Sequence, residues 1–184
     1  TFTDIKLNIM NTNSNIKTNS FALEYGIFTG FVLTCWGFML YSLSAHYENS
    51  WTRFFVGITI QISGIVLASL AYKKKNLGFI SIKETLKIGV GLSLITSIFS
   101  VLFLILLSNF IEPDFFDKTY ELSYNYYMEY YPEALEMQGI SDKNKFLELS
   151  HSRTNYAYIF IPVTLCFIGL ISSFIIGLFV KKNK

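Results

Sequence analysis

Two histidines are the first residues to consider in this 184-residue chain, because a histidine beside a carboxylate can bind a metal ion or move a proton. His46 lies near Glu48, and His151 lies near Glu148. The two pairs fall in separate connecting segments and lack the short, regular ligand spacing of a zinc site. We therefore expect both histidines to face outward and predict no metal site.

Two cysteines, Cys35 and Cys166, fall in the middle of long apolar segments. Apolar surroundings raise the pKa of a thiol and make it unreactive, so we expect both to serve in packing. The sequence also lacks intramembrane aspartates, an H-E-x-x-H helix, a Walker loop and a Rossmann fingerprint. These absences count against an ion-coupled transporter, a metalloprotease and an ATPase. We identify no catalytic residue and predict no cofactor, nucleotide or nucleic acid.

The segments around these residues are unusually apolar. Hydrophobic residues make up 52% of the chain and charged residues only 15%, whereas a soluble domain carries about 25% charge. Four runs without Lys, Arg, Asp or Glu are each long enough to cross ~30 Å of hydrocarbon; they are residues 25–47, 54–72, 88–111 and 154–180. The sequence predicts an all-α integral membrane protein with four transmembrane helices in two hairpins, and it disfavours soluble enzymes and disulfide-stapled secreted modules.

The positions of the lysines predict the orientation of these spans. Residues 73–87 contain five lysines and one acid, and the C-terminus ends with three more lysines within residues 181–184. Residues 112–153 instead contain nine acids and four bases. Because Lys and Arg are enriched on the cytoplasmic side of membrane proteins, we expect both termini in the cytoplasm and residues 112–153 outside.

The chain divides into two parts. Residues 1–20 are polar and predict a mobile tail, and residues 21–184 form the four-helix domain, including the outer segment 112–153. Ser81 and Glu84 have the spacing of a capping box, so the third helix should begin after Ser81 and run to Ile111. Pro162 should kink the fourth helix.

Small and polar residues recur every three or four positions in each span, which places them on one helix face. Span association depends on such close packing, because lipid tails are as apolar as leucine. The residues expected at helix contacts are Gly26, Gly30, Gly57, Gln61, Gly64, Gly89, Ser93, Gly169, Ser173 and Gly177. The alternative is that Gln61 and the serines of the third span line a polar passage.

The outer segment between the third and fourth spans predicts a small helical cap. Its aromatic stripe recurs every three or four positions and consists of Phe116, Tyr120, Tyr124, Tyr127 and Tyr131. Pro132 should end this helix, Gly139 should supply a stop, and Ser141 should start a second helix. The stripe fits an aromatic interface belt or cap packing, and it also fits a docking surface for a protein, a lipid or a glycan.

Three motifs of the sequence resemble the family catalogued as domain of unknown function 4199 (DUF4199), small four-span membrane proteins of Bacteroidota. They are residues 25–28 (Tyr-Gly-Ile-Phe), 75–81 (Lys-Asn-Leu-Gly-Phe-Ile-Ser) and 109–115 (Asn-Phe-Ile-Glu-Pro-Asp-Phe). The resemblance covers about residues 21–182 and implies the four-helix fold and an inner-membrane location. The family has no established activity, so it implies no catalytic residue. The outer segment is tyrosine-rich where relatives are richer in Glu and Gln.

Three classes of function remain open from the sequence. The first is a non-enzymatic accessory or scaffold subunit, in contact with the lipid bilayer and with another membrane protein or a second copy of itself. The alternative is a small transporter or lipid flippase that handles polyprenol-linked sugars beside a membrane glycosyltransferase. An enzyme is the third.

Overall fold

The computed structural model describes residues 17–182 except 48–50 and 141. Four long helices dominate this part of the chain: α2 (Thr18–Ser42), α3 (Trp51–Lys75), α4 (Ile82–Leu106) and α8 (Thr154–Val180). Each is long and apolar enough to cross a membrane, and the third span continues beyond α4 to Ile111. The predicted all-α architecture with four spans is confirmed.

The start of the first span differs from the sequence prediction. The predicted tail, residues 1–20, lies outside the described residues as far as position 16, and its last residues already belong to α2. The backbone N–H and the hydroxyl of Ser20 both donate to the carbonyl of Lys17, at 3.2 and 2.8 Å. These two bonds satisfy a carbonyl at the helix start, so helical structure reaches further toward the N-terminus than composition indicated.

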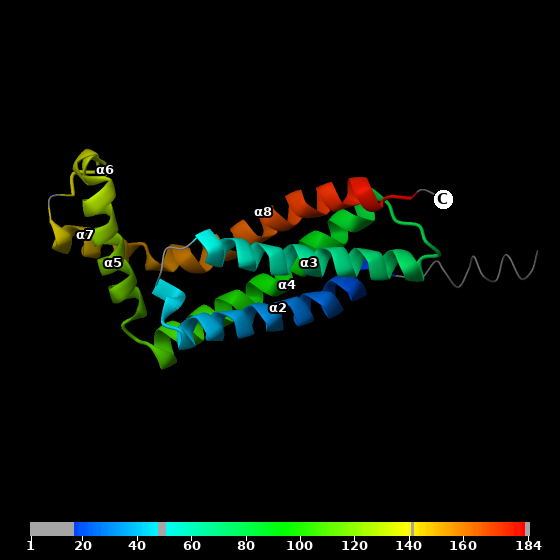
Figure 1. The fold of residues 1–184 in the computed structure, drawn as a ribbon, viewed down its shortest axis with the longest axis horizontal. Coiled ribbons are helices and arrows are strands. Elements are labelled where there is room, and N and C mark those ends of the chain that lie inside the picture. The colour runs from blue at the N-terminus through cyan, green and yellow to red at the C-terminus, as the bar shows by residue number, and fades with distance from the viewer. Residues whose placement is uncertain (1–16, 48–50, 141, 183–184) are drawn as a thin grey trace, which may run out of the picture.

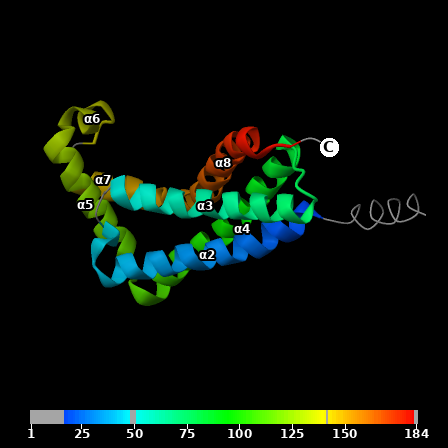
Figure 2. The same ribbon diagram turned by 45° about the vertical axis from the view of Figure 1, so that its right-hand side comes forward.

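The four helices lie roughly along one direction and form an elongated bundle (Figures 1 and 2). In Figure 1, α2 and α4 run from right to left, and α3 and α8 return in the opposite direction. We call the end where α3 meets α4 the lysine end, because Lys73–Lys75 close α3 there. The opposite end, which carries the short helices, is the cap end.

Helix α4 occupies the centre of the bundle and contacts α2, α3 and α8. Its buried residues recur at helical spacing and include several small or hydroxyl-bearing side chains: Thr85, Ile88, Gly89, Leu92, Ser93, Thr96 and Ser97. The hydroxyls of Ser93 and Thr96 donate to carbonyls one turn earlier in the same helix, at 2.9 and 3.0 Å. Because their polar groups are satisfied internally, these side chains can face a neighbouring helix without leaving an unpaired donor.

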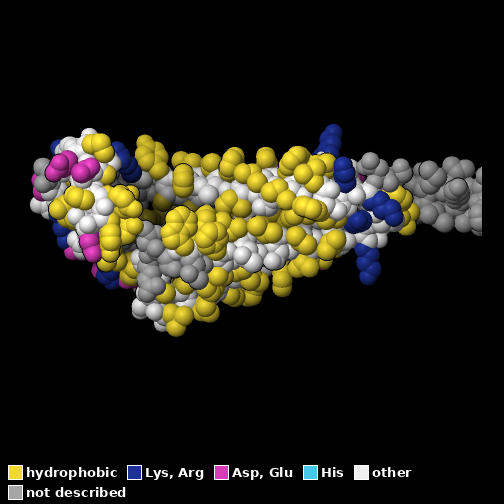
Figure 3. All heavy atoms as spheres, turned by 45° about the horizontal axis from the view of Figure 1, so that its top comes forward, with side chains coloured by type: hydrophobic (Ala, Val, Ile, Leu, Met, Phe, Trp, Pro, Cys, Tyr) yellow, Lys and Arg dark blue, Asp and Glu magenta, His cyan; other side chains and the backbone are white. Residues whose placement is uncertain are grey.

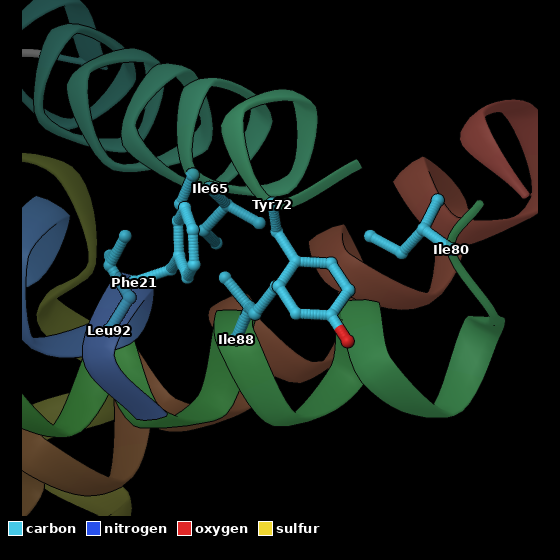
Figure 4. Packing of buried hydrophobic residues seen from close by; sticks show 7 residues of the cluster. Phe21, Ile65, Tyr72, Ile80, Ile88 and Leu92 are labelled. Atoms are coloured by element: carbon cyan, nitrogen blue, oxygen red, sulfur yellow. The ribbon is translucent and has the colours of Figure 1, made fainter. Parts of the chain in front are cut away.

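The apolar core lies near the lysine end. Phe21 of α2 meets the ring of Tyr72 of α3 edge-on, with 5.4 Å between the ring centroids. Ile65, Ile88 and Leu92 surround this pair from α3 and α4 (Figure 4). The edge-to-face arrangement suits the quadrupoles of two aromatic rings, so this cluster fixes the relative position of three helices.

The start of α4 is closed by the predicted capping box. The Ser81 hydroxyl accepts from the Glu84 N–H at 3.2 Å, while the Glu84 carboxylate accepts from the Ser81 N–H at 2.7 Å. The hydroxyl of Tyr72 donates to the same carboxylate at 2.6 Å. Glu84 therefore satisfies early N–H groups of α4 and also ties the end of α3 to the start of α4.

Backbone hydrogen bonds also attach the end of α8 to the connection between α3 and α4. Ile80 and Lys182 form an isolated antiparallel bridge, with N–H to carbonyl distances of 3.2 and 2.9 Å. The ammonium group of Lys73 donates to the carbonyl of Val180 at 2.9 Å. The last turn of a helix leaves carbonyls without partners, and Lys73 satisfies one of these in α8.

The cap end carries a turn of π-helix (Leu107–Ile111) and three short helices, α5 (Phe115–Tyr130), α6 (Pro132–Met137) and α7 (Lys143–Ser152). Helix α5 crosses the end of the bundle (Figure 1). As predicted, Pro132 separates α5 from the next helix, and Gly139 adopts a positive φ of 65° after α6. The predicted start at Ser141 lies outside the described residues; the Asp142 side chain caps α7 by accepting from the Lys145 N–H.

The side chains on the surface are sorted along the long axis of the molecule. Hydrophobic side chains cover the middle of the bundle, Lys and Arg side chains gather at the lysine end, and acidic side chains appear at the cap end (Figure 3). Large apolar residues such as Phe31, Phe160 and Phe167 are at least 60% exposed on these spans. An apolar belt between two polar ends is what a lipid-facing surface requires.

Candidate functional site

Helices α4 and α8 approach each other closely through paired glycine and serine residues. A Cβ atom added to Gly169 would lie 1.8 Å from the Ser93 hydroxyl oxygen, and one added to Gly89 would lie 2.3 Å from the Cβ of Ser173. Two Gly-x-x-x-Ser sequences therefore pack reciprocally across two antiparallel helices. Only residues without a side chain allow this approach, since any Cβ at either glycine would push the backbones apart.

Gln61 connects α3 to this contact. Its side chain is fully buried, and its amide nitrogen donates to the Ser93 hydroxyl at 2.8 Å and to the Leu165 carbonyl at 3.0 Å. The amide oxygen of Gln61 has no hydrogen-bond partner in the described part of the chain. Gln61 thus joins three helices. Of the two roles that the sequence left open, these contacts match helix packing and not the lining of a polar passage.

Helix α2 uses glycines to admit larger side chains. Cβ atoms at Gly26 and Gly30 would lie 2.9 and 2.6 Å from the side chains of Ile95 and Phe99 of α4. Gly64 of α3 performs the same role for α2, because its Cβ would lie 2.2 Å from the hydroxyl of Thr29. These predicted packing positions all lie where two spans touch.

Two other positions predicted to pack differ from this pattern. Gly177 is buried, but a Cβ there would meet Ile82 and Thr85 only at ordinary contact distances of 3.4 Å or more. Gly57 has nothing within 4 Å of its Cβ position, so the expectation that it makes a close helix contact is wrong. The reason is geometric: a cavity separates α3 from its neighbours at this level.

This cavity lies in the cap-end half of the bundle and has a volume of about 640 Å³. We call it the apolar cavity. Residues of all four spans line it, among them Leu33, Trp36, Phe54, Gly57, Ile161 and Ile168. Arg53, near the start of α3, is the one charged residue among the described residues that line it.

A second cavity, of about 410 Å³, lies between α5 and the start of α3. We call it the aromatic cavity, because Tyr47, Phe115, Tyr126 and Tyr127 line it together with Arg53. The rings of Tyr47 and Phe115 stack with 5.8 Å between centroids. Burial, together with the nearby Glu112 carboxylate, raises the pKa of Tyr47 far above its ordinary value, so its hydroxyl stays neutral.

The predicted aromatic stripe of the cap divides into a packed half and an exposed half. In the packed half, Phe116 meets a tyrosine ring of α8 edge-on. The hydroxyls of Tyr120 and Thr154 share a hydrogen bond of 2.9 Å, and the ring of Tyr124 lies 5.5 Å from that of Phe146 of α7. These three stripe residues attach α5 to α7 and α8 and are partly buried, so they do not form an open docking surface.

The exposed half contains Tyr127 and Tyr131, and two tyrosines that the predicted stripe omitted, Tyr126 and Tyr130. We call these four residues the tyrosine patch. Their rings contact one another, with Tyr126 and Tyr130 only 5.0 Å apart between centroids, and Tyr130 and Tyr131 remain 59% and 54% exposed. The sequence feature that could have identified Tyr126 and Tyr130 is the high density of tyrosines in this helix. The prediction used helical spacing, which selected the residues of only one helix face.

Neighbouring groups raise the pKa of two tyrosines of the patch. The neighbouring Tyr131 hydroxyl, followed by desolvation, raises the pKa of Tyr126, and a hydrogen bond with the Glu129 carboxylate raises the pKa of Tyr130. Since an ordinary tyrosine already has a pKa near 10, both hydroxyls are protonated at neutral pH. They can therefore donate hydrogen bonds to a bound molecule.

Polar side-chain contacts also join α5 to α7. His151 lies 2.9 Å from the Asp117 carboxylate, whereas the sequence placed it beside Glu148, and Lys143 pairs with Glu121. These contacts are exposed, and such pairs contribute about 0–1 kcal/mol each. They orient the short helices but do not anchor them.

Neither the histidines nor the cysteines gather into a reactive centre in the described residues. No group of three His, Cys, Asp or Glu side chains that could hold a metal ion occurs there. Cys166 is half-buried in α8, but Cys35 is exposed on α2, so the expectation that it packs inside the bundle is wrong. A position on a lipid-facing side of the helix is equally compatible with an apolar run.

The chain was also compared with known proteins. The sequence model of DUF4199, a family described as a protein of unknown function, matches residues 24–182. The chain belongs to the DUF4199 family. The match includes all four spans nearly complete and the whole cap, so both cavities and the tyrosine patch lie inside the DUF4199 region. No curated protein and no solved structure matches the chain.

The two classes of glycine can be compared by the same small substitution. We expect Gly169→Ala to lower thermal stability in detergent, because the new Cβ meets Ser93 at the close α4–α8 contact. The matched control, Gly57→Ala, should leave stability unchanged or raise it by up to about 1 kcal/mol, since alanine favours helix and the site is open. Equal loss in both variants would contradict the close α4–α8 contact.

Gln61 yields a second prediction, because the Ser93 hydroxyl oxygen and the Leu165 carbonyl both accept from its amide nitrogen. Gln61→Leu should cost only about 1 kcal/mol, since hydrogen bonds across membrane helices contribute about 0.6 kcal/mol each. Gln61→Glu should cost about 3 kcal/mol or more when ionised, because the Ser93 hydroxyl beside it already donates to the Gly89 carbonyl and the Leu165 carbonyl can only repel a buried carboxylate.

The pH dependence separates the two Gln61 variants. Burial raises the pKa of a carboxyl in the folded state above its pKa in the unfolded state. The Gln61→Glu variant should therefore lose stability as the pH rises from the unfolded-state pKa to the folded-state pKa. Thermal unfolding in detergent at pH 5 and pH 8 measures this difference, and Gln61→Leu should show none of it. A Gln61→Glu variant that is as stable as Gln61→Leu at both pH values would mean that an unseen donor reaches this position.

Proposed function

We propose that this multi-pass membrane protein is a non-enzymatic accessory or scaffold subunit of an inner-membrane complex, and that its tyrosine patch docks the partner. The observation that carries the proposal is the cluster of four exposed tyrosines at the end of α5, in which the ring of Tyr126 contacts the other three. Tyrosine combines a large apolar area with a polar hydroxyl at low entropy cost, and it is enriched among residues that dominate binding energy.

The packing of the cap supports a docking role. Tyr120, Tyr124 and Phe116 already attach α5 to α7 and α8, and within the patch Tyr127 also meets Phe146 of α7. No ring contact of Tyr130 or Tyr131 with α7 or α8 occurs among the described residues, so these two are the tyrosines left for docking. Leu122 and Met128 of the same helix are also nearly half exposed. An exposed aromatic and apolar surface beside a membrane fits a partner that is itself anchored in that membrane, including a second copy of this chain.

The lysine distribution supports an orientation for this complex. Lys73–Lys75 and the end of α8 meet at one end of the bundle, and the acid-rich cap lies at the other. The proposed topology places the lysine end and both termini in the cytoplasm and the cap in the periplasm. The partner would then contact this protein at the outer surface of the inner membrane.

A second candidate function, a small transporter or lipid flippase, is favoured by the apolar cavity. The cavity is formed by all four spans and is large enough to accept part of a lipid. Gln61 and Ser93, which would line a polar passage in that function, hydrogen-bond across helices instead. Transport activity for polyprenol-linked sugars in reconstituted vesicles would favour this candidate over the docking role.

Photo-crosslinking in intact cells tests the docking role. A photoreactive residue at Tyr130 or Tyr131 should give one protein adduct of defined mass, whereas the same residue at Leu178, an exposed position of α8 far from the cap, should give none. Tyr130→Ser with Tyr131→Ser should remove the adduct formed from a probe at Met128 without lowering thermal stability, because neither side chain packs the cap. Adducts with lipid alone would make the patch an interface belt and overturn the docking role.

Cysteine labelling tests the proposed topology. In a background without Cys35 and Cys166, a membrane-impermeant thiol reagent added to intact cells should label a cysteine at Asn125 in the cap. It should label a cysteine at Lys74, at the lysine end, only after the membrane is opened. The reverse pattern would invert the orientation and move the docking surface to the cytoplasm.

A further inference from the structure

The apolar cavity and the aromatic cavity share one residue. Arg53 lines both of them, at the cap end of α3. On one side of Arg53 the walls are apolar and extend into the spans as far as Leu33 and Ile168. On the other side lie aromatic rings and hydroxyl groups beneath α5. The two cavities together provide a large apolar volume, the cationic side chain of Arg53 where they meet, and an aromatic volume next to it.

The apolar cavity has the properties of a site for a hydrocarbon chain. It lies within the membrane-spanning length of α2, α3 and α8, where lipid tails surround the protein. Water in such a cavity would have few hydrogen-bond partners, and an empty cavity would forfeit dispersion contacts along all of its walls. A lipid tail from the surrounding bilayer satisfies both conditions.

Arg53 indicates which chemical group of the ligand follows its hydrocarbon chain. A guanidinium group presents five donors in a planar fork that matches the oxygens of a phosphate. Arg53 also has a contact within the chain, and the number of its donors allows it to serve that contact and a ligand together. A phosphate next to Arg53 would lie where the apolar walls end, as the phosphate of a phospholipid lies at the end of its acyl chains.

The aromatic cavity identifies the remainder of the headgroup. Tyr47, Phe115, Tyr126 and Tyr127 surround it with ring faces and edges, and ammonium groups are attracted to such rings. The cap around it is acidic, with nine acids against four bases in residues 112–153. This charge favours a cationic group and disfavours an anionic headgroup beyond the phosphate.

We propose that the two cavities form one binding site for a phospholipid with an ammonium headgroup. One acyl chain occupies the apolar cavity, the phosphate contacts Arg53, and the ammonium group lies among the rings of the aromatic cavity. The site shares Tyr126 and Tyr127 with the tyrosine patch, but Tyr130 and Tyr131, where the docking role is tested, line neither cavity.

Native mass spectrometry of the full chain in detergent tests this site, with phosphatidylethanolamine and phosphatidylglycerol of identical acyl chains as probes. We expect one phosphatidylethanolamine molecule to bind, with about fivefold to tenfold higher affinity than phosphatidylglycerol, which is the scale of a partly desolvated cation–π contact. Progressive addition of several molecules without a preferred first one would overturn the proposal. Equal affinity for the two lipids would do the same.

Three variants separate the parts of the site. Gly57→Leu should abolish the single bound lipid, because its side chain enters the apolar cavity, where nothing lies within 4 Å of the Cβ position. Val163→Phe is the matched control, since it adds bulk to an exposed position of α8 that does not line the cavity. Lipid binding that persists in Gly57→Leu, or is lost equally in Val163→Phe, would contradict the placement of an acyl chain in the apolar cavity.

The headgroup contacts have their own readouts. Tyr126→Leu should keep one bound lipid but lose the preference for phosphatidylethanolamine, because the leucine retains apolar contact and removes the ring. Arg53→Gln should weaken binding of both lipids by about tenfold or more, as expected for loss of a charge-assisted phosphate contact. If Arg53→Gln does not fold, the Gly57→Leu and Tyr126→Leu results still decide the proposal. Unchanged lipid preference in Tyr126→Leu would overturn the assignment of the ammonium group.

Discussion

The fold depends on the close approach of α4 and α8. In a bilayer no hydrophobic force draws one apolar helix toward another, so association requires close packing and hydrogen bonds between helices. Gly89 and Gly169 supply the first by leaving room for Ser173 and Ser93, and Gln61 supplies the second by donating from α3 into the same contact. The other spans are arranged around this contact: α2 packs on the opposite side of α4, and the cap continues from α4 and returns into α8.

The same arrangement explains why the two ends of the bundle differ. At the lysine end, the Tyr72 hydroxyl, the capping box of α4 and the bridge between Ile80 and Lys182 join three helices tightly. At the cap end, α3 separates from α2 and α8, and the apolar cavity lies between them. A cavity at one end is tolerated because the contacts at the other end and at Gln61 already fix the helices. The cap-end cavities are thus a consequence of where the small residues are placed.

The sequence allowed the four spans, the capping box and the break at Pro132 to be predicted, because each depends on local chemistry. Charge-free runs report the length of a span, and Ser81 with Glu84 reports a helix start. The neighbour of each small residue was not predictable, since spacing identifies a helix face but not the helix that covers it. Gly57 and Gly64 belong to one stripe, yet Gly64 packs on Thr29 and Gly57 faces a cavity. The π-helical turn at Leu107–Ile111 has no distinctive residue type and was missed. The aromatic stripe likewise identified one face of α5, but spacing alone did not reveal that Phe116 and Tyr120 would be covered by α8.

The hydrogen bonds that attach the end of α8 to Ile80 and Lys73 have a consequence for biosynthesis. The final residues of the last span bond to a connection that is made about a hundred residues earlier. Until α8 has been synthesised and inserted, the Gly89 and Ser93 face of α4 has no partner and the Lys73 ammonium has no Val180 carbonyl to bind. The first three described spans therefore have an open seam, and the bundle closes only when α8 has been inserted beside them. A chain cut within α8 would leave that seam open, because it would lack the Val180 and Lys182 backbone groups that bond to Lys73 and Ile80.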